Sequence, residues 1–472
     1  MKPEQKNDSL FEKLWAGHVI EHLGDDMDLI YIDRHLLHDL SGPASLGQLI
    51  EKGLPLHSKA QTYAVPDHSV STEPGRTADS TEVSKQLLIP LRNYCRELGI
   101  RLFDLNNEEQ GIVHVIGPEL GLTLPGCSIA CGDSHTCTHG AFGALAWGIG
   151  STEITQVLAT QALIVEKPLS MRVLFRGRPP RETSPKDLIL YLIGKHGAKG
   201  GTRHAVEFAG ETIETMSLDG RLTVCNLAVE FGAKFGFIAP DEKTYQYLKE
   251  RPYAPKGRSW EKAVEAWRRL PSGLSAGFDR EITIEATMVK PQITWGTSPE
   301  EVIPVDGRIP SLREAPDEKT AEAWKKSLAY MGLSGGSPIE GLPIEHVFIG
   351  ACTNGRLSDL TAAAELVKGR KVAAKVRAWV VPGSKAVKRE AEAKQLDRIF
   401  KEAGFEWREP GCSLCLGMNG ELIPSGERCV STSNRNFVGR QGPGARTHLA
   451  SPRTAAAAAI AGKIISASEL GG

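Results

Sequence analysis

One local pattern recurs in this chain and restricts its fold: a short apolar run, a polar loop that contains glycine, and a helix with a good capping residue. Residues 346–349 form such a run and lead into a loop around Cys352, after which a helix is predicted from Ser358. Residues 405–407 form another run, which ends at a loop around Cys412. Strands that alternate with helices predict an α/β fold with mostly parallel sheets, in which binding residues gather beyond the carboxyl ends of the strands.

Other segments extend this prediction along the chain. Ser184-Pro185 and Ser451-Pro452 each combine an N-cap hydroxyl with proline at the first helical position, so each predicts the start of a helix. Residues 375–381 and the alternating residues 281–289 predict strands. Residues 290–316 are rich in proline and glycine and are expected to form a long connection between lobes.

The length of the chain predicts more than one lobe, because 472 residues are many for a single core. We place boundaries near Lys167 and Lys290, which gives subdomains 1–167, 168–289 and 290–472. No short-period repeat is visible in the sequence.

Charge and hydropathy exclude several classes of partner. The 56 Lys+Arg residues balance the 57 Asp+Glu residues, so no global charge attracts nucleic acid or an anionic membrane. No apolar run approaches the roughly 20 residues that a membrane span needs, and the polar residues 1–6 lack the apolar core of a signal peptide. A cytoplasmic protein is expected.

The nine cysteines are spread without the spacing of a disulfide framework, so reduced thiols are expected. Cys127, Cys131 and Cys137 fit neither the usual zinc patterns nor the spacing of radical enzymes that use S-adenosylmethionine. We interpret these three as small buried apolar residues. The same interpretation applies to Cys95, Cys225 and Cys429.

Cys352, Cys412 and Cys415 form the most informative set of residues. Cys412 and Cys415 lie one turn apart, and Cys352 lies far upstream in the loop Gly-Ala-Cys-Thr-Asn-Gly-Arg. Three thiolates hold a four-iron cluster but leave one iron without a protein ligand, and an iron with an open site acts as a Lewis acid toward a hydroxyl group. A Cys-x-x-Cys pair taken alone is also compatible with a zinc half-site, a redox pair or chance.

Two short motifs place a carboxylate beside an imidazole: Asp67-His68 and Asp133-Ser134-His135. A histidine that a carboxylate orients is a natural acid for a leaving hydroxyl, because the carboxylate holds the ring and favours its charged form. Without further context, such pairs are more often surface or capping features.

Three blocks of the sequence extend these observations to a known family. Residues 31–35 (Tyr-Ile-Asp-Arg-His), 131–136 (Cys-Gly-Asp-Ser-His-Thr) and 433–437 (Ser-Asn-Arg-Asn-Phe), together with the two cysteine loops, resemble the aconitase superfamily from about Leu10 to Gly462. The resemblance implies a module of three α/β subdomains around a cluster cleft. It also implies one 4Fe-4S cluster with Cys352, Cys412 and Cys415 as ligands and one open iron. Ala351 departs from the family, which usually has serine there.

The resemblance also implies roles for individual residues. His68, paired with Asp67, is the expected general acid, and Asp133 and His135 are expected to orient the hydroxyl or water at the open iron. His114 and Glu230 match site positions and are expected to support the same proton network, although a buried structural role for either stays open. The positions expected at the substrate are Ser134, Arg435 and Arg440, and those expected near the cluster sulfurs are Asn226, Asn354 and Asn434.

The two arginines are also informative in themselves, since each binds a carboxylate in a fork and two of them suit a dicarboxylic acid. A generic arginine-rich loop would otherwise be a solvated surface. Within the superfamily, the chain resembles the large subunits of the two-subunit branch, so a small subunit is expected to bring the carbon base and another substrate arginine. The implied activity is that of a hydro-lyase that isomerises 2-isopropylmalate and 3-isopropylmalate through isopropylmaleate in leucine biosynthesis.

Alternatives remain at this point. Related large subunits act on homoaconitate, citraconate or methylmalate-type acids. An iron-sensing protein that binds RNA would need a basic groove, which the charge balance does not indicate. A purely structural cluster is less compatible with three ligands, since these leave one iron exposed.

Overall fold

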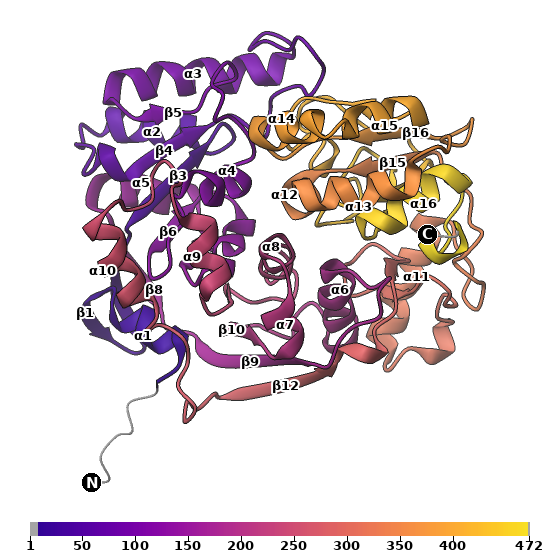
Figure 1. Cartoon of the computed structure of the whole chain (residues 1–472), viewed down its shortest axis with the longest axis horizontal. Helices are drawn as coiled ribbons and strands as arrows, with labels where there is room; N and C mark the ends of the chain where they lie inside the picture. Colours follow the sequence, from indigo (N-terminus) through magenta and orange to yellow (C-terminus); the bar gives the residue numbers. More distant parts are fainter. Residues whose placement is uncertain (1–7, 471–472) are drawn as a thin grey trace.

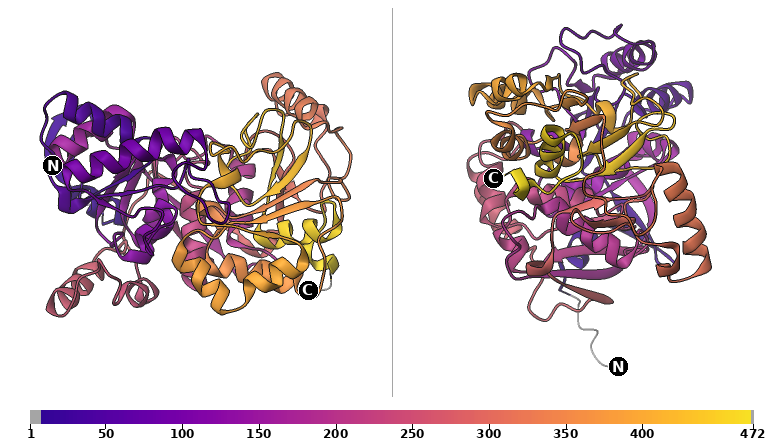
Figure 2. Two further views of the ribbon diagram at one scale, coloured as in Figure 1. Left: turned by 90° about the horizontal axis from the view of Figure 1, so that it is seen from above. Right: turned by 90° about the vertical axis from the view of Figure 1, so that its right-hand side faces the viewer.

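The computed structural model describes residues 8–470, so the polar residues 1–6 discussed above lie outside the described part. The early part of the chain (indigo to purple) and the late part (orange to yellow) lie side by side, and the middle part (magenta) lies below them (Figure 1). Seen from above, the early and late parts form two lobes (Figure 2). Among the described helices, none is both long and apolar enough to cross a bilayer.

The first lobe is built on a parallel five-stranded sheet with the order β5-β4-β3-β6-β7. Its strands are β3 (Arg34–His38), β4 (Thr62–Val65), β5 (Arg101–Leu102), β6 (Ser128–Cys131) and β7 (Leu145–Gly148). Its helices are α2 (Gly42–Glu51), α3 (Glu82–Leu98), α4 (Val113–Leu120) and α5 (Ser151–Thr160). Helix α1 (Leu10–Ala16) and an antiparallel sheet of β1 (Val19–Gly24), β2 (Met27–Tyr31) and β8 (Ala162–Glu166) complete it.

The middle part contains a parallel four-stranded sheet with the order β11-β10-β9-β12. Its strands are β9 (Leu169–Arg176), β10 (His204–Ala209), β11 (Phe235–Phe237) and β12 (Arg280–Glu285). Its helices are α6 (Pro185–His196), α7 (Glu211–Thr215), α8 (Leu218–Asn226), α9 (Glu242–Leu248) and α10 (Arg258–Trp267).

The late part contains a second parallel five-stranded sheet, with the order β17-β16-β15-β18-β19. Its strands are β15 (His346–Ile349), β16 (Arg377–Val380), β17 (Glu406–Trp407), β18 (Arg428–Ser431) and β19 (Arg446–Leu449). Its helices are α11 (Glu318–Met331), α12 (Ala351–Asn354), α13 (Leu357–Val367), α14 (Lys385–Ala393), α15 (Leu396–Ala403) and α16 (Pro452–Ala461). The prediction of an α/β fold with mostly parallel sheets is confirmed.

The three parallel sheets share one strand order. In each, the first strand along the chain lies inside the sheet, the next two strands add on one side, and the fourth strand adds on the other side. In such an order the loops after the first and fourth strands diverge and leave a crevice beyond the carboxyl ends. In the two five-stranded sheets this change of direction falls between β3 and β6 and between β15 and β18.

Several predicted elements agree with the structure and two differ from it. The strands at residues 346–349, 375–381 and 405–407 are present as β15, β16 and β17, and Ser184 and Ser451 cap α6 and α16. The strand predicted over residues 281–289 ends at Glu285, where the chain forms a 3-10 helix that exposes Met288.

The long connection predicted at residues 290–316 is also more ordered than expected. It forms an antiparallel hairpin of β13 (Gln292–Thr294) and β14 (Val302–Pro304). Trp295, just after the hairpin's first strand, is 1% exposed and joins the core of the late part. The apolar side chains in this stretch therefore override its proline and glycine content. For the whole chain, we propose the division into subdomains 1–167, 168–289 and 290–472, because each parallel sheet lies within one of these ranges.

Candidate active site

The two carboxylate–histidine motifs meet beyond the carboxyl ends of β4 and β6. His68 Nδ1 lies 2.5 Å from Asp67 Oδ1, and His68 Nε2 lies 3.0 Å from Asp133 Oδ2. The second oxygen of Asp67 accepts a hydrogen bond from the backbone N–H of Val113, at 2.8 Å. One imidazole is thus held between two carboxylates, both of which lie in buried surroundings.

This arrangement favours a protonated His68. Burial alone would lower the pKa of His68, but the negative charge of Asp67, the neighbouring Cys412 and the hydrogen bonds to both carboxylates raise it well above its ordinary value. Burial likewise opposes ionisation of Asp133, yet hydrogen bonds from His114, His135 and His68 hold its pKa well below the usual range. These contacts favour the charged imidazole, which has a proton on each ring nitrogen, as a general acid requires.

The network continues from Asp133 toward the late part of the chain. The backbone N–H of His135 donates to Asp133 Oδ1 at 2.7 Å, and His135 Nε2 lies 3.1 Å from Glu230 Oε1. Arg435 Nε donates to the same Glu230 oxygen at 2.6 Å. Burial alone would raise the pKa of Glu230, but His135 and Arg435 hold it below its ordinary value. The network thus connects the site residues of all three sheets.

His114 lies behind this network, on α4. Its Nε2 atom is 3.4 Å from Asp133 Oδ1, and its Nδ1 atom is 3.1 Å from Nε2 of the buried His139. Thr123 Oγ1 lies 2.6 Å from the other nitrogen of His139. His114 is therefore buried between Asp133 and His139.

The three predicted cysteines are buried. Cys352 lies in the short helix α12 after β15, and Cys412 and Cys415 lie in the segment after β17. Asn226 Nδ2 and Asn434 Nδ2 lie 3.1 and 3.4 Å from Cys352 Sγ, and Asn434 Oδ1 accepts from Cys415 Sγ at 3.2 Å. One amide therefore bridges the sulfurs of Cys352 and Cys415. Cys412 immediately precedes the 3-10 turn Ser413–Cys415. The backbone N–H of Cys415 donates to the Cys412 carbonyl oxygen at 2.9 Å.

Both cysteine loops contain a non-glycine residue with a left-handed backbone. Ala351 has φ +69°, and Ser413 has φ +47°. Residues other than glycine rarely adopt this backbone conformation. Those that do concentrate at functional sites, where the surrounding structure enforces it. Each of the two residues is a direct neighbour of a predicted cysteine ligand.

The remaining predicted residues lie around this centre in different ways. Arg440 Nε donates to the backbone oxygen of Cys415 at 2.8 Å, and Ser134 Oγ lies 3.4 Å from His135 Nδ1. Asn354 faces elsewhere, since its amide donates to Asp359 at 3.0 Å and lies 3.4 Å from Thr223 Oγ1. The structure thus brings the predicted residues together and gives Asn354 partners other than sulfur.

A buried carboxylate joins the second cysteine loop to the first lobe. Glu421 accepts hydrogen bonds from the backbone N–H and the hydroxyl of Thr72, each at 2.8 Å, and also from the hydroxyl of Ser413. Glu421 follows the cysteine loop, and Thr72 follows His68 on the loop after β4. These bonds fix the cysteine loop relative to the proposed acid.

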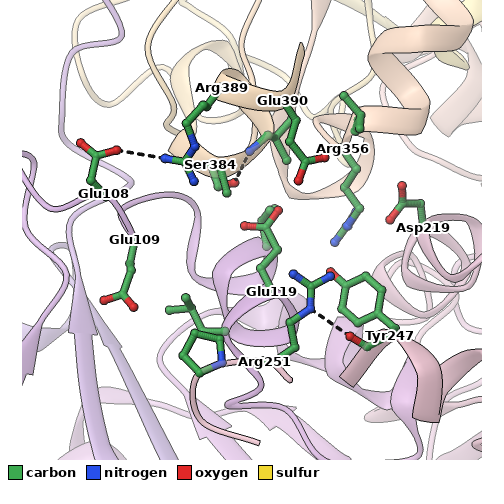
Figure 3. Close-up of a pocket in the computed structure, with 16 residues that line it drawn as sticks. Glu108, Glu109, Glu119, Asp219, Tyr247, Arg251, Arg356, Ser384, Arg389 and Glu390 are labelled. Atoms are coloured by element: carbon green, nitrogen blue, oxygen red, sulfur yellow. Dashed lines mark hydrogen bonds and ion pairs between the residues drawn. The ribbon is translucent and has the colours of Figure 1, made fainter. Parts of the chain in front are cut away.

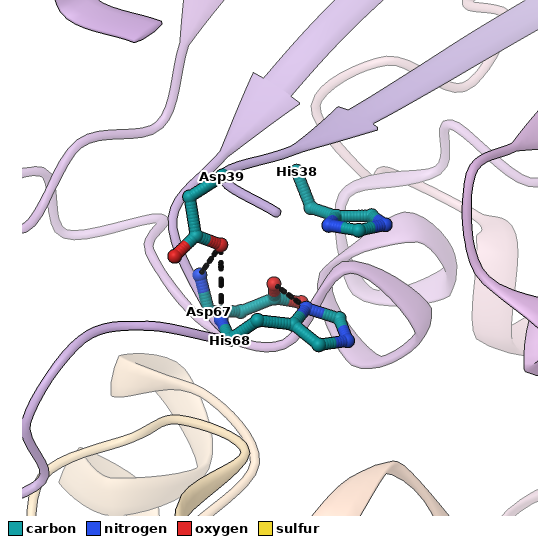
Figure 4. A group of neighbouring side chains, drawn as sticks. All are labelled: His38, Asp39, Asp67 and His68. Carbon is teal, nitrogen blue, oxygen red and sulfur yellow. Dashed lines mark hydrogen bonds and ion pairs between the residues drawn. The ribbon is translucent and has the colours of Figure 1, made fainter. Parts of the chain in front are cut away.

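Sequence reasoning missed His38, the last residue of β3, and Asp39, which follows it; both lie beside the Asp67–His68 pair (Figure 4). Asp39 accepts hydrogen bonds from the backbone N–H groups of Asp67, His68 and Ser69 at 2.7–3.0 Å. The ring of His38 stacks on that of His68, with centroids 4.3 Å apart. The signal that could have found them is a third pairing of histidine with aspartate, His38-Asp39, directly after the apolar residues Leu36 and Leu37.

The four residues His38, Asp39, Asp67 and His68 offer ligand atoms within 4.8 Å of one another. Their hydrogen bonds favour a different role. Nδ1 of His38 accepts from the backbone N–H of Leu40, both oxygens of Asp39 bind backbone groups, and Nδ1 of His68 binds Asp67. These atoms orient His68 and are already occupied.

Comparisons with known proteins identify the family. The sequence pattern described as "Aconitase family (aconitate hydratase)" matches residues 12–462. The chain belongs to the aconitase family. It is 60% identical over 456 residues to a protein named 3-isopropylmalate dehydratase large subunit 1 from Bradyrhizobium diazoefficiens, with 97% of this chain and 95% of that protein covered. A solved structure, holo aconitase X from Thermococcus kodakaraensis, matches with 13% identity and a TM-score of 0.47 over 86% of this chain and 84% of that one.

Membership of the aconitase family implies a 4Fe-4S cluster. The donor set of the site fits such a group. Three buried thiols lie together without a disulfide, and side-chain amides are directed at two of the sulfurs. Burial raises the pKa of Cys352 to about 12 in the protein alone, so cluster insertion must displace thiol protons.

A separate cavity of about 380 Å³ lies behind the first cysteine loop (Figure 3). Among the side chains that line it are Glu119, Asp219, Arg251 and Arg356. Arg356 donates hydrogen bonds to the backbone oxygens of Cys352 and Thr353 at 2.7 and 3.2 Å. None of the predicted catalytic residues lines this cavity, so it is distinct from the site.

Proposed function

We propose that this chain is the large, cluster-bearing subunit of a cytoplasmic 3-isopropylmalate dehydratase in leucine biosynthesis. The observation that carries the proposal is the 60% identity to the named large subunit over 97% of the chain. The network that connects Asp67, His68, Asp133, His135, Glu230 and Arg435 supports it, because dehydration needs an acid for the hydroxyl and cations for the carboxylates.

Cys352, Cys412 and Cys415 are the residues that would hold the cluster. When bound, the cluster supplies Lewis-acid chemistry from an iron without a cysteine ligand. Asn226 and Asn434 direct their amides at the sulfurs and would fix their orientation. Asn354, which lies beside this set, acts through Asp359 on the backbone of the first cysteine loop.

His68 is the proposed general acid. Asp67 fixes the ring through Nδ1, so the proton on Nε2 is directed toward Asp133 and the centre of the site. This proton passes to the departing hydroxyl oxygen, and in the reverse direction His68 takes it back from water. Asp133, held by His114 and His135, keeps the imidazole protonated between turnovers.

Arg435 and Arg440 are the proposed carboxylate ligands, with Ser134 at the substrate beside His135. The contact of Arg435 with Glu230 uses Nε, which leaves the two terminal nitrogens for a forked contact with a substrate carboxylate. Glu230 therefore sets the orientation of the guanidinium. Arg440 is held in the same way through Nε by the backbone of Cys415.

The carbon-bound proton needs a base, which we assign, with a further substrate arginine, to a small subunit. The test is anaerobic co-purification with that subunit, followed by an ultraviolet assay for the unsaturated acid. The account predicts formation of isopropylmaleate from 2-isopropylmalate by the pair and no activity of the large chain alone. Full turnover without a partner, or selective turnover of homocitrate or citramalate, would contradict it. Growth of a leucine auxotroph supplied with both subunits is the matching test in cells.

A further inference from the structure

Lys186 is a buried cation that the proposed mechanism does not use. It lies in the first turn of α6, on the middle subdomain, and its side chain is 0% exposed. Its Nζ atom donates to the backbone oxygens of Thr432 and Ser433 at 2.5 and 2.6 Å. These two residues immediately precede Asn434 and Arg435 at the end of β18, so the lysine binds the backbone that carries them.

The same backbone is linked to the first cysteine loop. Thr432 Oγ1 accepts from the backbone N–H of Gly350 at 2.8 Å and donates to the Gly350 oxygen at 3.0 Å. Gly350 is followed by Ala351 and Cys352. Lys186 therefore binds the backbone of Thr432, the residue whose side chain holds Gly350 at the start of the Cys352 loop. Thr432 also lies two residues before Asn434, so the contact reaches both loops.

Within residues 8–470, Lys186 forms no ion pair, so no carboxylate contacts its ammonium group. Asp187, its neighbour, is occupied by Ser184 and Gln292, and Asp359 by Asn354 and Arg356. Burial lowers the pKa of Lys186 to about 7, against opposing contributions from Cys415, Asp359, Asp187 and Cys352. Burial without an ion pair opposes the charged form of the ammonium group, so a nearby anion is required to keep it charged.

We propose that Lys186 is a positioning residue with two effects: it fixes the Thr432–Ser433 backbone that presents Asn434 and Arg435, and it places a positive charge behind the cluster. This inference rests on the proposed function, because the anion it invokes is the thiolate-bound cluster. A positive charge stabilises the reduced, more negative cluster, so Lys186 raises the reduction potential. It also keeps the arginine in the orientation that binds substrate.

Three substitutions separate these effects. Lys186→Gln keeps a donor for the two carbonyls and removes the charge, Lys186→Met removes both, and Lys186→Arg keeps the charge. Lys195→Met, on the exposed end of the same helix, is the matched control. The readouts are the midpoint potential of the cluster, followed by electron paramagnetic resonance in a redox titration, and KM and kcat of the assembled enzyme.

The account predicts a more negative midpoint potential in K186Q and K186M, and wild-type potentials in K186R and K195M. It also predicts a several-fold rise in KM that is larger in K186M than in K186Q. Wild-type potentials in both uncharged variants would overturn the inference. If K186M does not fold, K186Q carries the test, because it retains the hydrogen bonds. A wild-type chain that binds no cluster would instead refute the proposed function.

Discussion

The backbone N–H of Cys412 donates a hydrogen bond to the carbonyl oxygen of Asp67 at 2.8 Å. Cys412 follows β17 in the late part of the chain, and Asp67 follows β4 in the first lobe. This bond places a proposed cluster ligand directly beside the carboxylate that orients the proposed acid. This bond and those between Thr72 and Glu421 therefore hold the proposed cluster ligand and the proposed acid together across two subdomains.

The first prediction concerns the pH dependence of catalysis. Asp67 raises the pKa of His68, so Asp67→Asn lowers that pKa and deprotonates the acid at a lower pH. The alkaline limb of the kcat/KM profile should move to lower pH, and kcat should fall by roughly 10²-fold, within the usual range for loss of acid–base catalysis. Asp104→Asn, which removes a carboxylate paired with Arg92 away from the site, should leave the profile unchanged. An unshifted alkaline limb in D67N would exclude His68 as the acid.

The second prediction concerns the carboxylate-binding arginine. Arg435→Lys keeps the charge but loses the fork, so KM for the hydroxy acid should rise about tenfold or more. The cluster absorption should stay, because the Arg435 guanidinium binds Glu230 and, within residues 8–470, forms no hydrogen bond with a cysteine. Arg172→Lys, at the ion pair with Glu281 between β9 and β12, is the control. A wild-type KM in R435K would remove Arg435 from the substrate site.

The third prediction concerns the cluster ligands. Cys412→Ser should abolish both the visible absorption of the anaerobically reconstituted chain and its activity with the small subunit. Cys429→Ser replaces a thiol that is equally buried, on β18, and should preserve both properties. Retention of three or more irons with unchanged absorption in C412S would refute the ligand assignment.

The fourth prediction concerns folding. Burial raises the pKa of Asp187 to about 6 in the folded chain, against 3.8 for the unfolded chain. Between these values the folded state binds more protons, so the free energy of unfolding falls as pH rises through the window and levels off above it. Asp187→Asn removes this dependence. The free energy of unfolding of the wild type, taken relative to that of the variant, should therefore fall by on the order of 2–3 kcal/mol from pH 4 to pH 7.

Denaturant unfolding of the cluster-free chain at several pH values measures this effect. Asp317→Asn is the control, because Asp317 caps α11 with a pKa that its hydrogen bonds lower, so its contribution has the opposite sign. A pH-independent difference between wild type and D187N would contradict the account.

Sequence reasoning predicted the local elements well because capping residues and apolar runs act over short distances. The strand at residues 346–349 and the helix that begins after Ser184 have these signals in full. The hairpin around Trp295 was missed, since its proline and glycine content favours a loop and only packing against the late core decides otherwise. The common strand order of the three sheets was also missed, because it repeats in space without a repeat in sequence.

The candidate site residues could be predicted from short motifs and from the family resemblance. The residues that orient them could not. Asp39 binds the loop of His68 through backbone groups, and Lys186 binds the loop of Asn434 across subdomains. The His38-Asp39 pair is visible in the sequence, but the hydrogen bonds that Asp39 and Lys186 form are not, because their partners are main-chain atoms that any residue supplies. Only the spatial arrangement reveals them.

We propose that Cys352, Cys412 and Cys415 would hold a cluster in which one iron, without a cysteine ligand, would supply Lewis-acid chemistry to the substrate. Mössbauer spectroscopy of the chain reconstituted with ⁵⁷Fe and assembled with its small subunit tests it most directly. The account predicts that one iron of the four changes its spectrum when 2-isopropylmalate is added, while the other three do not. A spectrum in which all four irons ignore the substrate would contradict the claim.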